Sequence, residues 1–443
     1  MPVVNLWLLS LAHWGIDLLT HMLPPVMPLL VRELDLSVAR VAALATALSV
    51  SSGLLQPVLG AAVDRSGRAW LLPATVIWCG VFMSVYGFAS SYWVLMAAAV
   101  LAGLGAALFH PLASVGVRAV LGRFSAGGLS IFSVGGTVGM ASAPLFATMV
   151  VGWQGLAGLR WSIVPALLVA GALVLGGLHR LPLIRPAASG SAADGSHSPT
   201  SPAGGAQETP AGGAHEAPAG DAPASPAGSA PASPGAGQEA AAPASPNALR
   251  ALAYLAGGKF VRTIAQMAMA NFLPLYYVTL GAPESYAGLM LTVFLVVGSF
   301  SAVASGYLAD QVGRKPVVIL SSVLATPAFI GFLFTGGFVQ AAFLVLTSAC
   351  MYATFSVVPI YGQELVPTRP GMGAGLLMGG VWALASLCLI PLGSVADWAG
   401  VRLALLVAAL LPLLSAGLFL PVPETRPQSK PRLALTFPSR LVK

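Results

Sequence analysis

Six ionisable side chains lie inside long apolar stretches of this sequence, where a charge is expensive. They are His13, Asp17, His21, His110, Lys259 and Arg262. Carboxylate and imidazole groups bind and release protons, whereas guanidinium and ammonium groups pair with anions. An ionisable group at membrane depth marks an ion or substrate pathway by default. The residue types therefore predict a site that binds protons and a small solute.

His13, Asp17 and His21 share one face of a predicted helix, because they are spaced i, i+4, i+8. Asp17 and Arg262 each lie near the middle of an apolar run, so the two could form an ion pair. A substrate that competes for Arg262 would leave Asp17 free to take up a proton, and a histidine could relay it. Asp17 is thus either a proton-coupling group or a structural partner in helix packing. We predict no metal site, because i, i+8 is too long a separation for one ion.

His110 directly precedes Pro111 in another apolar run. Proline frees a backbone carbonyl one turn earlier and bends the helix. The imidazole therefore either bonds to the freed backbone or contacts substrate and relays a proton. We place His110 in two predicted sets, the proton-coupling set with His13 and Asp17 and the substrate-binding set.

The other predicted substrate-binding residues are His21 and three side chains of the run 250–279, namely Arg262, Gln266 and Asn271. For Arg262, the alternatives are contact with an anionic group or a structural role. Lys259 precedes it by three residues and either extends its amine toward water or takes part in binding.

The elements that must position these residues are transmembrane helices. Hydrophobic residues make up 57% of the 443 residues and charged residues 8%, against about 25% charged in a soluble protein. An α-helix satisfies its own backbone hydrogen bonds in lipid. The alternating pattern of a membrane β-barrel is not present in the sequence. We predict an all-α membrane protein with twelve apolar runs, at 5–31, 37–63, 70–90, 92–117, 126–152, 158–180, 250–279, 284–309, 316–336, 338–363, 371–396 and 400–421.

A charged phrase, G-x-x-x-D-x-x-G-R, closes the second run and returns at the end of the eighth. Several prolines repeat at nearly the same offset, which indicates two similar six-helix halves. The phrase predicts either a cytoplasmic gate or topology signals alone. The predicted gate residues are Asp64, Arg65, Gly67, Arg68, Asp310, Gly313, Arg314 and Lys315, with Glu364 near the end of the tenth run.

Four segments follow from this organisation. Residues 1–185 form the first six-helix bundle and residues 249–421 the second. Residues 186–248 are rich in Ala, Pro, Gly and Ser, with acidic residues as their only charges, which predicts a disordered cytoplasmic linker. Residues 422–443 form a cytoplasmic tail. The linker is either passive or regulatory.

Orientation follows from the positions of the 21 Lys and Arg residues. With both termini in the cytoplasm, fifteen of them fall in inner turns and the tail, and four fall in outer turns, at Arg32, Arg40, Arg160 and Arg402. Positive residues concentrate on the cytoplasmic side. We therefore expect a multi-pass protein of the cell inner membrane with both termini inside.

Two six-helix halves, a long central loop and the repeated phrase resemble the major facilitator superfamily. Within it, the chain is similar to the fosmidomycin-resistance group of drug efflux proteins. The residues that carry this second resemblance are Ala12-His13 with Asp17, Leu55-Gln56-Pro57, the segment 103–111 that ends in Phe-His-Pro, and the segment 130–136. The resemblance implies a central cavity lined by helices 1, 4, 7 and 10, which are the helices that hold the ionisable residues.

The resulting hypothesis is a secondary active transporter that exports a small drug-like or metabolite compound in exchange for protons by alternating access. A proton-coupled importer or facilitator is the alternative within transport, and a transporter-like membrane sensor is the alternative outside it. No enzyme motif such as HExxH, GxSxG or a phosphate loop is present. We expect a monomer in the lipid bilayer with no cofactor and no nucleic-acid partner.

Overall fold

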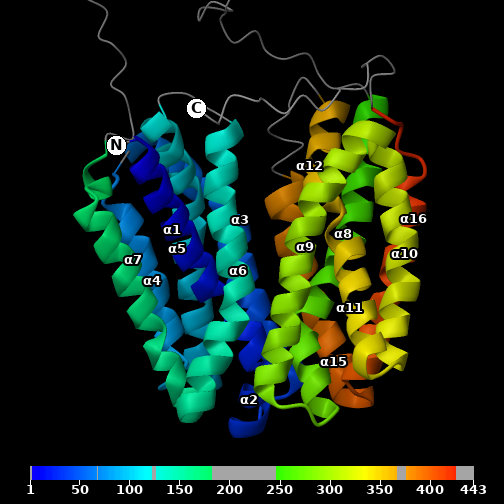
Figure 1. Ribbon diagram of the computed structural model, residues 1–443, viewed down its shortest axis with the longest axis horizontal. Coiled ribbons are helices and arrows are strands. Elements are labelled where there is room, and N and C mark those ends of the chain that lie inside the picture. Colours follow the sequence, from blue (N-terminus) through cyan, green and yellow to red (C-terminus); the bar gives the residue numbers. More distant parts are fainter. Residues whose placement is uncertain (1, 67, 122–125, 182–245, 367–375, 426–443) are drawn as a thin grey trace, which may run out of the picture. The chain divides into compact units, whose positions relative to one another are not determined.

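The computed structural model describes residues 2–66, 68–121, 126–181, 246–366 and 376–425 (Figure 1). All of the elements that these residues form are helices. Most of the predicted linker 186–248 and most of the predicted tail 422–443 lie outside the described residues, so both remain predictions.

The described residues of the first half form nine helical elements. They are α1 (Pro2–Thr20), α2 (Leu23–Glu33), α3 (Val38–Ser66), α4 (Leu71–Val85), α5 (Tyr92–Leu121), α6 (Ala126–Gln154), the 3-10 helix η1 (Gly155–Ser162), α7 (Ile163–Leu175) and the 3-10 helix η2 (Leu178–Arg180). α1 and α2 together form the first predicted run, and η1 and α7 form the sixth.

The second half repeats this pattern. Its elements are α8 (Pro246–Thr279), α9 (Glu284–Val312), α10 (Arg314–Phe334), α11 (Gly337–Tyr352), α12 (Thr354–Leu365), the π-helix η3 (Leu376–Gly380), α14 (Val381–Leu387), α15 (Leu389–Ala399) and α16 (Val401–Phe419).

Nine helical stretches within the described ranges are long and apolar enough to cross a membrane. One of them, Ile131–Leu175, covers two predicted runs, because η1 lies between α6 and α7. α4 is apolar but shorter, and α8 holds the two buried cations of the second half. With these counted separately, each of the twelve predicted runs corresponds to one helix or to consecutive helices. The chain is therefore an all-α membrane protein.

Proline interrupts the first membrane helix, a feature that the run count does not predict. Pro24 and Pro25 occupy the first turn of α2 and cannot donate backbone hydrogen bonds to the preceding turn. α1 consequently ends at Thr20, and His21 lies at the break. The tenth membrane helix is also divided, between α11 and α12, and Tyr352 ends its first part.

The two halves pack against each other through a small set of helices. α3 packs on α14 and α15, α6 packs on α9, and α2 packs on α8. We call the end of the bundle at which α3 and α9 begin the distal end, and the end at which they finish the proximal end. Figure 1 follows the described helices in chain order, from blue α1 to red α16.

A carboxylate of the second half closes the distal end. Asp397, in α15, accepts hydrogen bonds from the backbone N–H groups of Val38 at 2.6 Å and Ala39 at 3.0 Å, the first residues of α3. A helix N-terminus has free N–H groups and a partial positive charge, so a carboxylate there is stabilising. The absence of a side chain at Gly393 lets α15 approach the backbone of Ala39.

An ion pair adds a second link at the same end. The Arg32 guanidinium, in α2, lies 2.6 Å from the carboxylate of Glu284, in the first turn of α9. Both links join residues of different halves. The structure is therefore of a state that is closed at the distal end.

Asp397→Asn should weaken this closure, because an amide keeps the shape of the side chain but loses the charge that faces the start of α3. The loss should be about 1 kcal/mol. Spin labels at exposed Ser91 and Phe338 should then report an added population with a longer distance. Asp35→Asn is the control, since Asp35 is exposed and adopts a left-handed conformation that Asn tolerates. Identical distance distributions for wild type and Asp397→Asn would contradict the closing role.

Candidate functional site

Asp17 stands at the centre of a cluster of ionisable side chains in the first half. Its carboxylate lies 3.3 Å from Nε2 of His13 and 3.8 Å from Nε2 of His110. The side chains are mostly buried, with exposed fractions of 15% for Asp17, 14% for His13 and 27% for His110. α1 and α5 thus bring together the three residues of the predicted proton-coupling set.

The hydrogen bond of His13 with the backbone fixes where its other nitrogen points. Nδ1 lies 2.9 Å from the carbonyl oxygen of Phe132. Because a carbonyl only accepts, Nδ1 must carry the proton of this bond. Nε2 then faces the Asp17 carboxylate. Without a proton between them, a nitrogen lone pair would face an anionic oxygen, so this contact is favourable only when the pair holds an additional proton.

His110 joins this cluster instead of bonding to the backbone that Pro111 frees. Its ring lies 5.3 Å from the His13 ring, in an edge-on arrangement. Two imidazoles from different helices therefore face one carboxylate. The three donor atoms lie within 4.8 Å of one another. This set differs from His13, Asp17 and His21, for which the sequence predicts no metal site, and spacing by itself assigns no metal here.

Helix α6 encloses the cluster through a glycine and an aromatic ring. A side chain at Gly136 would collide with the His13 ring and with Oδ2 of Asp17. The Phe132 ring stacks on the His13 ring at 4.2 Å. Gly135 and Gly139 likewise approach the backbone of α1, at Ser10 and Trp14. The close helix packing that these glycines permit therefore encloses the ionisable pair directly.

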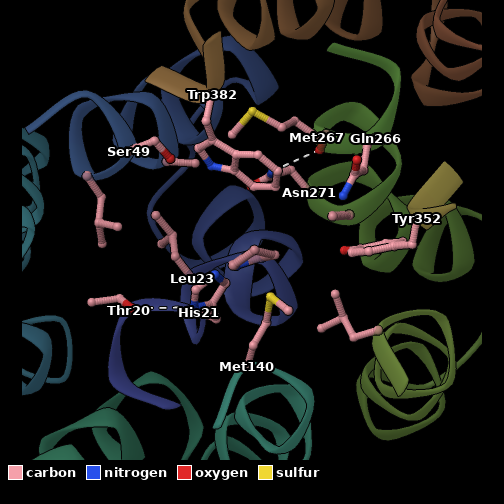
Figure 2. A pocket seen from close by; sticks show the side chains of 15 residues that line it. Thr20, His21, Leu23, Ser49, Met140, Gln266, Met267, Asn271, Tyr352 and Trp382 are labelled. Atoms are coloured by element: carbon pink, nitrogen blue, oxygen red, sulfur yellow. Dashed lines mark hydrogen bonds between the residues drawn. The ribbon is translucent and has the colours of Figure 1, made fainter. Parts of the chain in front are cut away.

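A pocket lies next to this cluster and is lined by both halves of the chain (Figure 2). The first half contributes Thr20, His21, Leu23, Pro24, Ala45, Leu48, Ser49 and Met140; the second contributes Gln266, Met267, Ala270, Asn271, Leu295, Tyr352 and Trp382. Three of the predicted substrate-binding residues, His21, Gln266 and Asn271, are thus brought together. Figure 2 shows Trp382 and Tyr352 extending toward the pocket from the second half and His21 from the first.

The polar side chains of the pocket differ in how many of their hydrogen bonds are formed. Asn271 donates to the carbonyl oxygen of Met267 at 2.8 Å. His21 Nδ1 lies 2.9 Å from the backbone oxygen of Asp17, so His21 connects the pocket to the last turn of α1. The amide of Gln266 is buried and makes no hydrogen bond of normal geometry within the described part of the chain.

Arg262 does not pair with Asp17, the partner that the sequence suggested. It is fully buried in the second half and donates to the hydroxyl groups of Ser322 and Ser321 in α10 and to the carbonyl oxygen of Cys350 in α11. It does not line the pocket, and its partner is not Asp17, whose own neighbours are imidazoles. Its contacts are those of a side chain that ties α8 to two neighbouring helices.

Lys259 does not extend to water. Its side chain is 4% exposed, and Nζ lies 5.5 Å from the centre of the Phe355 ring. An ammonium over an aromatic face is attracted by the ring quadrupole. Phe355 in turn meets Trp382, with ring centres 6.3 Å apart. Phe355 thus connects Lys259 with Trp382, which lines the pocket.

The second copy of the repeated phrase forms a charged network at the proximal end. Arg314 pairs with the carboxylates of Asp310 and of Glu364, the latter at 3.2 Å. The carboxylate that meets the start of α10 is Glu424, which accepts from the backbone N–H groups of Arg314 and Lys315, each at 3.0 Å. Asp310 does not occupy this helix start and pairs with the side chain of Arg314 instead.

Gly313 permits the Glu424 contact, because its φ of +109° suits glycine and a Cβ atom would meet Oε2 of Glu424. In the first copy of the phrase, Gly67 and the side chains of Asp64 and Arg65 lie outside what the structure describes, and Arg68 is exposed. A gate formed by both copies therefore remains a prediction.

Sequence reasoning missed several residues of these sites. Tyr352 and Trp382 gave no signal beyond their apolar runs, although Tyr352 ends α11. Asp397 and Glu424 are single acids near helix ends, and their partners lie hundreds of residues away along the chain or on another helix. Only the fold shows which helix start each carboxylate meets.

Comparisons with known proteins agree with this architecture. The family model described as Major Facilitator Superfamily matches residues 9–250 and 255–441. The chain is 28% identical over 419 residues to the Uncharacterized MFS-type transporter YfnC of Bacillus subtilis (strain 168) and 26% identical over 425 residues to the Fosmidomycin resistance protein of Escherichia coli (strain K12). Each alignment covers 93% of this chain and 91% of the relative.

Solved structures show the same fold at low sequence identity. A bacterial homologue of the human lysosomal transporter Spinster, in an inward-facing and occupied conformation, superimposes with a TM-score of 0.69 at 16% identity, covering 94% of this chain and 95% of the other. The nucleoside transporter NupG gives a TM-score of 0.68 at 13% identity, covering 94% and 98%.

Gly136→Ala should disrupt the cluster, because the added methyl group occupies the space of the His13 ring and the Asp17 carboxylate. Gly152→Ala is the matched control on the same helix, since a Cβ atom there meets nothing within 4 Å. Alanine stabilises a helix interior by about 0.5–1 kcal/mol relative to glycine. Thermal unfolding of the purified variants should therefore show a lower midpoint for Gly136→Ala and an unchanged or higher one for Gly152→Ala. Equal midpoints would contradict the tight packing at Gly136.

Proposed function

Because this chain belongs to the Major Facilitator Superfamily and is a transporter, we propose that it exports a small organic compound from the cell in exchange for protons. The observation that carries this proposal is the juxtaposition of two sites. A pocket lined by both halves of the chain lies beside the His13–Asp17–His110 cluster, and His21 belongs to the pocket while bonding to the backbone of Asp17. Substrate and proton sites that share one helix can influence each other.

The cluster supplies the proton-dependent step. With a proton between Nε2 of His13 and the Asp17 carboxylate, the two side chains attract each other and hold the start of the pocket-lining segment in place. When the proton leaves, the lone pair and the anion repel, and Asp17 turns toward His110 on α5 or toward water. The contact of α1 with α5 and α6 therefore depends on proton occupancy.

Alternating access follows from closure at one end at a time. In the structure, Asp397 and the Arg32–Glu284 pair join the halves at the distal end. We assign the proximal network of Arg314, Asp310 and Glu364 to the gate that operates when the opposite end opens. The two six-helix bundles then rock about the pocket.

The proximal end faces the cytoplasm in this proposal. Support comes from the sequence, whose apolar runs assign fifteen of the Lys and Arg residues to the turns and tail on that side and four to the turns on the other. The protein would then sit in the inner membrane as a monomer with both termini inside, and the distal closure would make the structure inward-open. The similarity to the Fosmidomycin resistance protein supports export of a drug-like compound.

Asp17→Asn should abolish proton-driven transport, because an amide cannot take up the proton that the His13 contact requires. In proteoliposomes with an imposed pH gradient, fosmidomycin serves as the probe. Wild type should move the compound only with the gradient, and Asp17→Asn should reduce this flux at least about tenfold, the fold-change of about 1.4 kcal/mol. Asp35→Asn is the control for a lost surface charge. Gradient-driven flux by Asp17→Asn at the wild-type rate would refute the coupling role.

The direction of transport is tested in cells. A fosmidomycin-sensitive bacterial host that expresses the chain should grow at higher drug concentration than the same host with Asp17→Asn. Greater sensitivity of the wild-type strain would indicate uptake instead and would contradict export.

A further inference from the structure

The second half buries two cations without an acidic partner. Lys259 and Arg262 lie one turn apart on α8, and both are at least nine-tenths buried. From residue 246 to the end, the sequence contains five acidic residues: Glu284, Asp310, Glu364, Asp397 and Glu424. Contacts of all five are present in the described part of the chain and show which charges and helix ends these acids meet there.

None of these acids contacts Lys259 or Arg262. Glu284 pairs with Arg32, Asp310 and Glu364 pair with Arg314, and Asp397 and Glu424 meet the starts of α3 and α10. All five therefore serve the distal or the proximal end of the bundle. An uncompensated charge inside an apolar bundle is unfavourable and marks a functional position.

The two cations are satisfied to different degrees. Arg262 donates through its two terminal nitrogens to two serine hydroxyls and a backbone carbonyl, while its buried Nε makes no hydrogen bond in the described part of the chain. Lys259 faces the ring of Phe355, which attracts the ammonium but accepts no conventional hydrogen bond. Of the terminal nitrogens of the two cations, Nζ of Lys259 is therefore the one with capacity for a ligand.

Lys259 also lies on the pocket side of its helix. It precedes Gln266 by seven residues, which is two turns and about 10.5 Å along the same helix face. Gln266 lines the pocket, and its buried amide makes no hydrogen bond of normal geometry in the described structure, although it interacts with the side chain of Tyr352. Phe355 links Lys259 to two lining residues, with ring centres 6.2 Å from Tyr352 and 6.3 Å from Trp382.

We propose that the transported compound is an amphipathic organic anion, whose anionic group binds Lys259 and whose apolar or aromatic part lies against Phe355, Tyr352 and Trp382. This assignment rests on the proposed transport function and names its substrate class. Gln266 supplies a hydrogen bond to the part between the two. Arg262 holds α8 in position and lends positive potential without direct contact.

The proposal has a consequence for the protein without ligand. If Lys259 is kept for an anion, its charge destabilises the empty protein. Lys259→Met preserves an unbranched side chain of similar length and removes the charge. The thermal unfolding midpoint of the purified full chain without ligand should then rise by about 2 °C or more. If the ammonium instead served only to stabilise packing on Phe355, the midpoint should fall, which would overturn the proposal.

Ligand binding is tested with matched probes, benzoate and benzamide, which differ mainly in charge. At millimolar concentration, benzoate should raise the unfolding midpoint of wild type more than benzamide does, because binding to the folded state stabilises it. Lys259→Met should lose the benzoate effect, Lys259→Arg should keep part of it, and Lys315→Met should keep all of it. Phenylphosphonate in place of benzoate distinguishes a phosphonate from a carboxylate preference.

Equal stabilisation of wild type and Lys259→Met by both anions would overturn the proposal. Because this measurement uses neither a pH gradient nor transport, it is independent of the coupling assay with Asp17→Asn. If wild type binds neither anion, the proposed substrate class is wrong. Proton-driven transport is then decided separately, by the assay with Asp17→Asn.

Discussion

A carboxylate facing two imidazoles inside an apolar bundle is the interaction on which the rest of the structure depends. The 3.3 Å contact of Asp17 with His13 is favourable when it holds a proton, since the other nitrogen of His13 faces the carbonyl of Phe132. Gly136 is the reason that α6 can close over this pair. The packing of three helices of the first half is therefore tied to one exchangeable proton.

The two halves handle buried charge in opposite ways. In the first half, two imidazoles surround the carboxylate of Asp17. A proton held within this cluster can therefore compensate the charge of Asp17. The second half buries two bases and directs all five of its acids to the ends of the bundle, where they meet helix starts and Arg side chains. The pocket lies between these two arrangements. In the proposed transport cycle, a proton on one side and an anion on the other would act on one pair of helices, α1 and α8.

Much of this molecule could be predicted from sequence, and the failures have a common cause. Apolar runs predicted each membrane helix, because length and hydropathy are local properties. Helical spacing placed His13, Asp17 and His21 on one face, but spacing does not choose the neighbouring helix. The sequence therefore could not decide whether Asp17 pairs with Arg262. In the fold, Asp17 lies beside His13 and His110. Arg262 donates hydrogen bonds to Ser322 and Cys350 instead. The contacts of Asp397 and Glu424 join distant segments and have no local pattern.

The central claim is that proton occupancy at Asp17 determines which end of the bundle is open. It is tested most directly, and without any substrate, by the distance between spin labels at Ser91 and Phe338 measured as a function of pH. In wild type the distance distribution should change with pH, as protons enter or leave the cluster. In Asp17→Asn it should stay the same at every pH. A pH response in Asp17→Asn equal to that of wild type would contradict the account.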